Sequence, residues 1–220
     1  MNQIRFLILC VLGMSAVLQG CNTTCVNGYY NSVCYSTGYY YDSRVSGIDY
    51  ETRVGDEVIA TGVTGDNGDP GLFLFVEGAT VSLSLGGTDL GQTAAKERVT
   101  LFDVAGITEE AIGGCDVSVS ASLPDDGSAF RIVHNVAALL QTLDTDGDPT
   151  GTIDISPDVA ALFENVSIDF DQPWEAFRAD TDLQTLLVAA NDGELFPAVR
   201  ELREREAALR ALYQGIGLCP

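Results

Sequence analysis

Basic residues are scarce in this chain. Its 220 residues include 11 Lys and Arg against 32 Asp and Glu, and the formal net charge at neutral pH is −21. A field of this sign repels nucleic acid and anionic lipid surfaces, so a nucleic-acid partner is excluded. The acidic excess serves either solvation in salty water or the attraction of cationic ligands and metal ions.

Recognised catalytic motifs are also lacking. No GxSxG, HExxH, Walker A or GxGxxG pattern occurs, and a zinc site is not expected because there is no CxxC pair and His134 is the only histidine. We therefore expect a non-catalytic protein. The alternative is a secreted, glycan-directed hydrolase that uses an acidic pair such as Asp169 and Asp171, since paired carboxylates perform acid–base chemistry on glycosidic bonds.

Long hydrophobic runs are confined to the start of the chain. Arg5 precedes an apolar run over residues 6–17, which is followed by Leu18-Gln19-Gly20-Cys21. A basic start, a short apolar core and small residues before a break are typical of a secretory signal. No later run approaches the ~20 residues that a transmembrane helix requires.

Residues 18–21 resemble the lipobox of bacterial lipoproteins at all four positions. The resemblance implies that residues 1–20 are a lipoprotein signal peptide, that cleavage falls before Cys21, and that Cys21 is acylated on its amine and its sulfur. More than one acyl chain gives stable membrane anchoring. Asn22 at the next position favours the outer membrane of the bacterial cell envelope, on its periplasmic or its surface face. An ordinary signal peptide with a chance cysteine is the alternative.

Cleavage before Cys21 would also remove Arg5 but no acidic residue, so the mature chain would carry a formal charge of −22.

Cysteines outside the signal and the lipidation site form an even set. Cleavage would remove Cys10, which leaves four cysteines besides Cys21. Four cysteines in an oxidising compartment predict two disulfides with three possible connectivities. We favour a short local loop closed by Cys25–Cys34, together with Cys115–Cys219.

Composition divides the mature chain into three segments. Residues 21–44 are rich in Tyr, Gly and Asn and predict a tether, or alternatively an adaptable binding patch. Residues 45–122 form a β-rich domain with strands expected at 58–60, 72–76, 80–85, 99–104 and 117–121, and Asn67-Gly68 marks a hairpin or a loop. Residues 123–220 form a helical domain packed on it.

Apolar residues in this last segment recur every three or four positions, which predicts amphipathic helices. We expect them over 128–143, 156–163, 171–177, 183–190 and 197–214, the last of which would bury Val199. The expected fold class is therefore α+β, with a small antiparallel β-sandwich-like half followed by a helical half.

Alternating carboxylates follow the first expected helix. Asp144, Asp146 and Asp148 surround Gly147, and Asp154 lies a little further on. Ca²⁺ takes six to eight oxygen ligands, and a bound cation would offset the unfavourable placement of Asp144 at a helix C-terminus. These four residues are candidate Ca²⁺ ligands. The alternative is a turn that caps the helix by local hydrogen bonds, because Pro149 and the missing closing glutamate depart from an EF-hand.

Two further residues invite a functional interpretation. His134 lies on the first expected helix, where a lone histidine is more often a hydrogen-bonded boundary residue than a catalyst. Trp174 is either a ligand platform or an anchor in the core or a lid, and we favour the anchor.

The two halves together resemble modules of bacterial secreted and cell-surface proteins. Thr64, Asn67-Gly68, Phe73, Phe75, Gly78 and Val81 look like a hairpin that is also similar to carboxypeptidase-regulatory-like β-sandwiches, and residues 135–144 with the 146–149 turn look like the helix and loop that follow it. The resemblance implies an envelope-associated, non-catalytic binding or structural module, with an envelope protein or a glycan as partner. An accessory subunit of an envelope complex is a further alternative.

Overall fold

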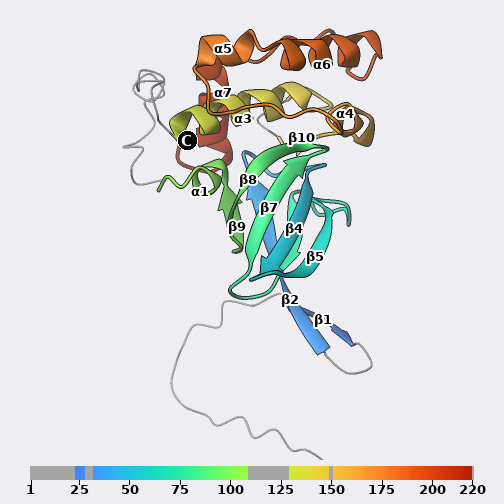
Figure 1. Ribbon diagram of the computed structural model, residues 1–220, viewed down its shortest axis with the longest axis vertical. Coiled ribbons are helices and arrows are strands. Elements are labelled where there is room, and N and C mark those ends of the chain that lie inside the picture. The colour runs from blue at the N-terminus through green and yellow to red at the C-terminus, as the bar shows by residue number, and fades with distance from the viewer. Residues whose placement is uncertain (1–22, 28–31, 109–128, 149–150, 220) are drawn as a thin grey trace, which may run out of the picture.

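The computed structural model describes residues 23–27, 32–108, 129–148 and 151–219. The fold is α+β, as the sequence predicts, with the strands concentrated in the first half of the chain. Figure 1 shows the strands at one end of the molecule and the helices gathered over the other. The predicted signal peptide and lipidation site, with the 117–121 strand, lie outside the described residues.

Strand β2 (Ser32–Tyr41) organises the first sheet. It pairs antiparallel with β1 (Thr23–Asn27) and β6 (Leu72–Phe75), and parallel with β9 (Arg98–Thr100). The tether predicted over 21–44 is therefore wrong for residues 32–41, which form a paired strand. Aromatic side chains take the place of aliphatic ones in the core beside this strand. Tyr40 is fully buried, and the ring of Phe73 packs so closely on the strand that a Cβ at Gly38 would lie 2.4 Å from it.

The second sheet has the strand order β5-β4-β7-β8 and is antiparallel throughout. Its strands are β4 (Asp49–Val54), β5 (Glu57–Val63), β7 (Thr80–Leu85) and β8 (Thr88–Ala94). Val81, Leu83 and Leu85 are buried, which the alternating sequence of β7 predicts. The rings of Tyr50 and Phe73 lie 5.9 Å apart and join the cores of the two sheets.

The loop between β5 and β6 connects different sheets. The sequence predicts either a hairpin or a loop at Asn67-Gly68. Because β5 pairs with β4 whereas β6 pairs with β2, this segment is a loop between two sheets. Residues 66–68 are exposed. Asn67 accepts a hydrogen bond from the backbone N–H of Asp69, whose carboxylate lies 2.9 Å from Arg44.

The strand predicted over 99–104 is wrong beyond Thr100. Thr100 caps the short helix α1 (Leu101–Val104), and the carboxylate of Asp103 accepts a hydrogen bond from the backbone N–H of Thr100. This capping box ends β9 and starts the helix within one residue.

Of the five helices predicted over 128–214, four match helices in the described residues closely. The helices are α3 (Phe130–Leu143), α4 (Pro157–Ala161), α5 (Trp174–Arg178), α6 (Thr181–Asp192) and α7 (Arg205–Gly215). The expected start of the last helix is wrong, since residues 197–204 are not helical and Val199 is 83% exposed. Asn191 anchors this non-helical segment by accepting a hydrogen bond from the N–H of Arg200 and donating one to its C=O.

The two halves share one hydrophobic core and are joined by polar contacts. β3 (Val45–Ser46) pairs in parallel with β10 (Ile153–Asp154), which lies within the helical part of the sequence. Deeper in the molecule, Gln141 of α3 bonds the buried carboxylate of Asp42. The chain therefore folds as interlocked halves and not as two separable domains.

Candidate functional site

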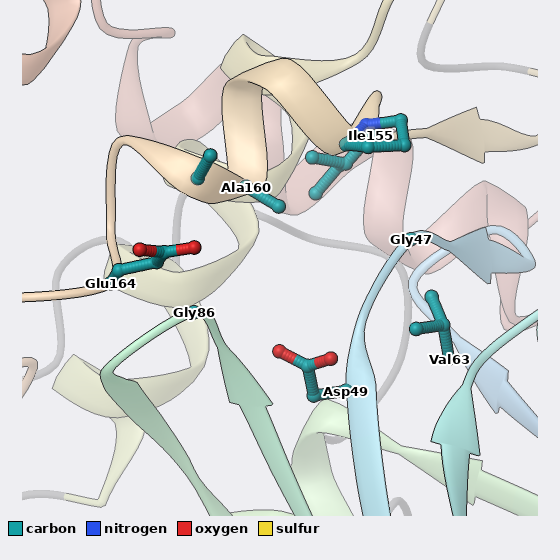
Figure 2. Close-up of a pocket in the computed structure, with 9 residues that line it drawn as sticks. Gly47, Asp49, Val63, Gly86, Ile155, Ala160 and Glu164 are labelled. Atoms are coloured by element: carbon teal, nitrogen blue, oxygen red, sulfur yellow. The ribbon is translucent and has the colours of Figure 1, made fainter.

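A cleft lies where the end of the second sheet meets helix α4. It has a volume of about 220 Å³. Asp49 and Val63 line it from the sheet, and Ile155, Ala160 and Glu164 line it from the α4 region. Figure 2 shows the carboxylates of Asp49 and Glu164 directed into the space beneath α4 from different sides. The cleft thus combines two acidic groups with aliphatic walls.

Local sequence signals position the walls of this cleft. In β4 the buried Tyr50 and Thr52 alternate with Asp49 and Glu51, so Asp49 is held on the opposite face at the end of the strand. Ser156 caps α4 by accepting from the N–H of Val159, as its sequence predicts, and Pro157 occupies the first helical turn. Strand β7 ends at Leu85, and Gly86 starts the turn beneath α4.

Close backbone contacts bound the cleft. The N–H of Gly87 donates to the carbonyl of Phe163 at 2.7 Å. A Cβ at Gly87 would lie 2.4 Å from the carbonyl oxygen of Glu164, and one at Gly47 would lie 2.1 Å from that of Ile155. Glycine is therefore required at both points, and the sheet end cannot move closer to α4.

Asp49 is the more enclosed of the two acidic residues. Burial raises the pKa of its carboxyl, and a hydrogen bond from the backbone N–H of Gly86 opposes that rise. Glu164 is exposed at the opposite side. A negative charge at Asp49 is thus poorly solvated, and a positive group between the two carboxylates would stabilise it.

The alternating aspartates form a hydrogen-bonded turn. Asp144 is buried at the C-terminus of α3 and accepts from the backbone N–H of Asp154, while Asp146 accepts from that of Asp148. Thr145 in turn donates to the carbonyl of Asp154. Asp154 therefore contributes its backbone rather than its carboxylate to these bonds. Within the described residues, no group of three His, Cys, Asp or Glu side chains is arranged to hold a metal ion. These contacts form a capping turn, and the calcium loop stays a prediction.

The pKa of Asp144 reflects this enclosure. Burial and the adjacent carboxylate of Asp146 raise it to about 6, against the opposing hydrogen bonds from the N–H groups of Asp154 and Gly147. Asp144 is consequently protonated at a mildly acidic pH at which most carboxylates are ionised.

Asp169 and Asp171, the candidate hydrolytic pair, lie in one exposed turn. Asp169 accepts from the backbone N–H of Asp171, and Asp171 lies 3.4 Å from Arg131. A glycosidase needs its two carboxyl groups on either side of the scissile bond. Neighbours in a single turn do not provide that arrangement.

His134 and Trp174 lie together in the interior. Trp174 is only 5% exposed and packs against Phe177, so the predicted core anchor is confirmed. His134 is 3% exposed and meets the indole edge-on, with ring centroids 6.1 Å apart. Its position is more enclosed than the helix flank that the sequence predicts.

The cysteines that the structure describes agree with an oxidised protein. Cys34 and Cys219 are each disulfide-bonded. Cys25 lies directly opposite Cys34 in the β1–β2 register, and the favoured local pairing stays a prediction. Cys115 lies outside the described residues, so the second pairing stays a prediction.

Sequence reasoning missed the main residues of the cleft. Asp49 and Glu164 are ordinary members of a large acidic excess, and no spacing connects them. The Gly86-Gly87 pair was the available signal, because adjacent glycines after a regular strand indicate close backbone approach.

Comparison with protein-family models, with curated proteins and with solved structures found no match. None of the helices in the described ranges has the length and apolar character needed to cross a bilayer.

Proposed function

We propose that the chain is a lipid-anchored, non-catalytic binding module of the bacterial cell envelope, held to the outer membrane through Cys21. Its binding site is the cleft between the second sheet and α4. The lipobox-like sequence at residues 18–21 supports the anchor, and the mixed acidic and aliphatic walls of the cleft support a binding role.

The observation that carries this proposal is the separation between the anchor end and the cleft. Strand β1 begins at Thr23, two residues after Cys21, and Thr23 lies opposite Ser36 in β2. Two residues span at most about 7 Å. In Figure 1, β1 projects from the end of the sheets that is remote from α4. A membrane that held Cys21 would therefore leave the cleft at the end of the molecule that is remote from the lipid.

Charge favours the same orientation. The mature chain would carry a formal charge of −22, which an anionic membrane surface repels. Acyl chains on Cys21 would hold the protein at the membrane while this repulsion keeps the body off the surface.

The experiment is metabolic labelling of the full chain with radioactive palmitate in a bacterial host, followed by separation of inner and outer membranes. We expect label on the wild-type protein in the outer-membrane fraction and none on Cys21→Ser. Cys10→Ser is the matched control, because it removes a cysteine from the same segment and should retain the label. Equal labelling of Cys21→Ser, or an unlabelled wild-type chain in the soluble fraction, would contradict the anchor.

A further inference from the structure

We propose that the cleft binds a small primary alkylamine, with its ammonium group between Asp49 and Glu164 and its alkyl stem along the aliphatic wall formed by α4. This inference rests on the proposed function only in taking the cleft as the binding site. It does not depend on the lipid anchor.

The charge of the ligand follows from the lining. Of the nine described residues that line the cleft, Asp49 and Glu164 are acidic and none is basic. Both carboxylates are directed into the same space in Figure 2. Asp49 already accepts one backbone hydrogen bond from Gly86, and an ammonium group offers three donors that could satisfy remaining carboxylate oxygen positions. A cation at this point is complementary to the site in both charge and hydrogen bonding.

The apolar part of the ligand follows from the opposite wall. Val63, Ile155, Pro157, Ala160 and Ala161 present aliphatic surface to the cleft. A bare divalent ion is a poor match for this lining, because Ca²⁺ and Mg²⁺ require six or more oxygen ligands. Methylene groups gain by contact with aliphatic side chains, so an ammonium group on a short alkyl stem matches the whole lining.

The size of the ligand follows from the borders. The backbone on both flanks of α4 is in close contact with the sheet side of the cleft. A Cβ at Gly87 would lie 2.4 Å from the carbonyl oxygen of Glu164, and one at Gly47 would lie 2.1 Å from that of Ile155. Opening the cleft would break the 2.7 Å hydrogen bond from Gly87 to Phe163. A volume of about 220 Å³ between fixed borders suits a free small molecule rather than an inserted polypeptide segment.

The test is isothermal titration calorimetry at pH 7 of the full chain in detergent micelles, with the heat of empty micelles subtracted. The probes are n-pentylamine, which is protonated at this pH, and n-pentanol, its neutral counterpart. We expect saturable binding of the amine and at least about tenfold weaker binding of the alcohol, because a charge-assisted hydrogen bond is lost.

Three variants of lining residues test the location of the site, and a fourth variant serves as the control. Asp49→Asn should weaken amine binding by about tenfold or more, and Glu164→Gln by a smaller factor because Glu164 is exposed. Asp192→Asn is the matched control, since it removes one exposed negative charge that is not part of the cleft lining and should leave binding unchanged. Ala161→Phe retains both carboxylates but fills the space beneath α4, and it should abolish binding. Thermal unfolding of each variant separates loss of the site from loss of the fold.

The outcomes distinguish this inference from the proposed function. Equal binding of n-pentanol and n-pentylamine, lost in Ala161→Phe, would overturn the cationic ligand while leaving the cleft as a binding site. Amine binding that persists in both Asp49→Asn and Ala161→Phe would place the amine elsewhere and overturn the inference. Binding of neither probe would overturn the inference and count against the cleft as the site, whereas palmitate labelling reports on the anchor alone.

Discussion

Gln141 of α3 bonds both carboxylate oxygens of Asp42, with its amide nitrogen 3.0 Å from Oδ1 and 2.9 Å from Oδ2. The same nitrogen lies 3.0 Å from the carbonyl oxygen of Ala208 in α7. Asp42 is fully buried and directly follows β2. The side chain of Gln141 therefore links the end of this strand to α3, which carries it, and to α7. This contact joins residues from the beginning, the middle and the end of the fold.

We expect the stability of the protein to fall as the pH rises from about 4 to about 7. Burial raises the pKa of Asp42 to about 7, against the opposing effects of Gln141 and Arg203. The folded state therefore keeps a proton that the unfolded state loses near pH 4, and it loses this advantage as the pH passes through 7. The raised pKa of Asp144, about 6, adds to the same slope.

Urea unfolding of wild type and Asp42→Asn across pH 4–8 checks this expectation. The variant should flatten the slope between pH 4 and 7, because asparagine does not titrate. Asp169→Asn is the control and should leave the slope as in wild type, since Asp169 is exposed. A slope that is unchanged in Asp42→Asn would contradict the assignment.

Replacement of Gly87 by Ala should destabilise the protein by about 1–3 kcal/mol. The added Cβ would lie 2.4 Å from the carbonyl oxygen of Glu164, so the sheet end and α4 would have to separate. Gly151→Ala is the control, because its nearest neighbour would be at an ordinary contact distance of 3.5 Å. Chemical denaturation measures the free energy of unfolding of both variants. Equal values would show that the added Cβ of Gly87→Ala meets no steric conflict with the backbone at Glu164.

Asn191→Ala should cost about 1–2 kcal/mol of stability, because two hydrogen bonds to the backbone of Arg200 are lost. Val199→Ala should change the stability by less than about 0.5 kcal/mol, since the side chain is 83% exposed. A large loss of stability in Val199→Ala, with none in Asn191→Ala, would instead support the helix that the sequence predicts over 197–204.

Thermal unfolding in EDTA and in millimolar Ca²⁺ should give the same melting temperature. Asp144 and Asp146 each already accept a backbone hydrogen bond through Oδ1 within the turn, so one oxygen of each carboxylate serves the cap. A calcium site filled at about 100 times its Kd would instead add about 2.7 kcal/mol. A rise that disappears in the double variant Asp146→Asn, Asp148→Asn would establish the calcium loop.

Periodicity predicted the elements that bury one regular face. Helix α3 was expected over 128–143 and occupies Phe130–Leu143, and the cap at Ser156 was correctly placed. Strand β2 was missed because its buried side chains are aromatic and lie among Ser, Thr and Gly, a composition shared with flexible segments. The start of α7 was misplaced because the bonds from Asn191 to Arg200 outweigh the helical pattern.

The cleft lay beyond sequence reasoning for a different reason. Asp49 and Glu164 line one cleft only because the second sheet ends beneath α4, next to the pairing of β3 with β10. Two-residue strands give no periodic signal. A site formed by residues that are distant in the sequence, with no periodic pattern between them, is found only from the three-dimensional structure.

The exposed loop at residues 66–68 offers a way to determine membrane sidedness. It connects two sheets and lies outside the cleft lining, and a Cβ at Gly68 would meet nothing within 4 Å. Exposed loop tips of this kind tolerate insertion and proteolytic nicking. A protease recognition sequence inserted between Asn67 and Gly68 would be cut in intact cells if the protein faces the medium, and only after the envelope is opened if it faces the periplasm.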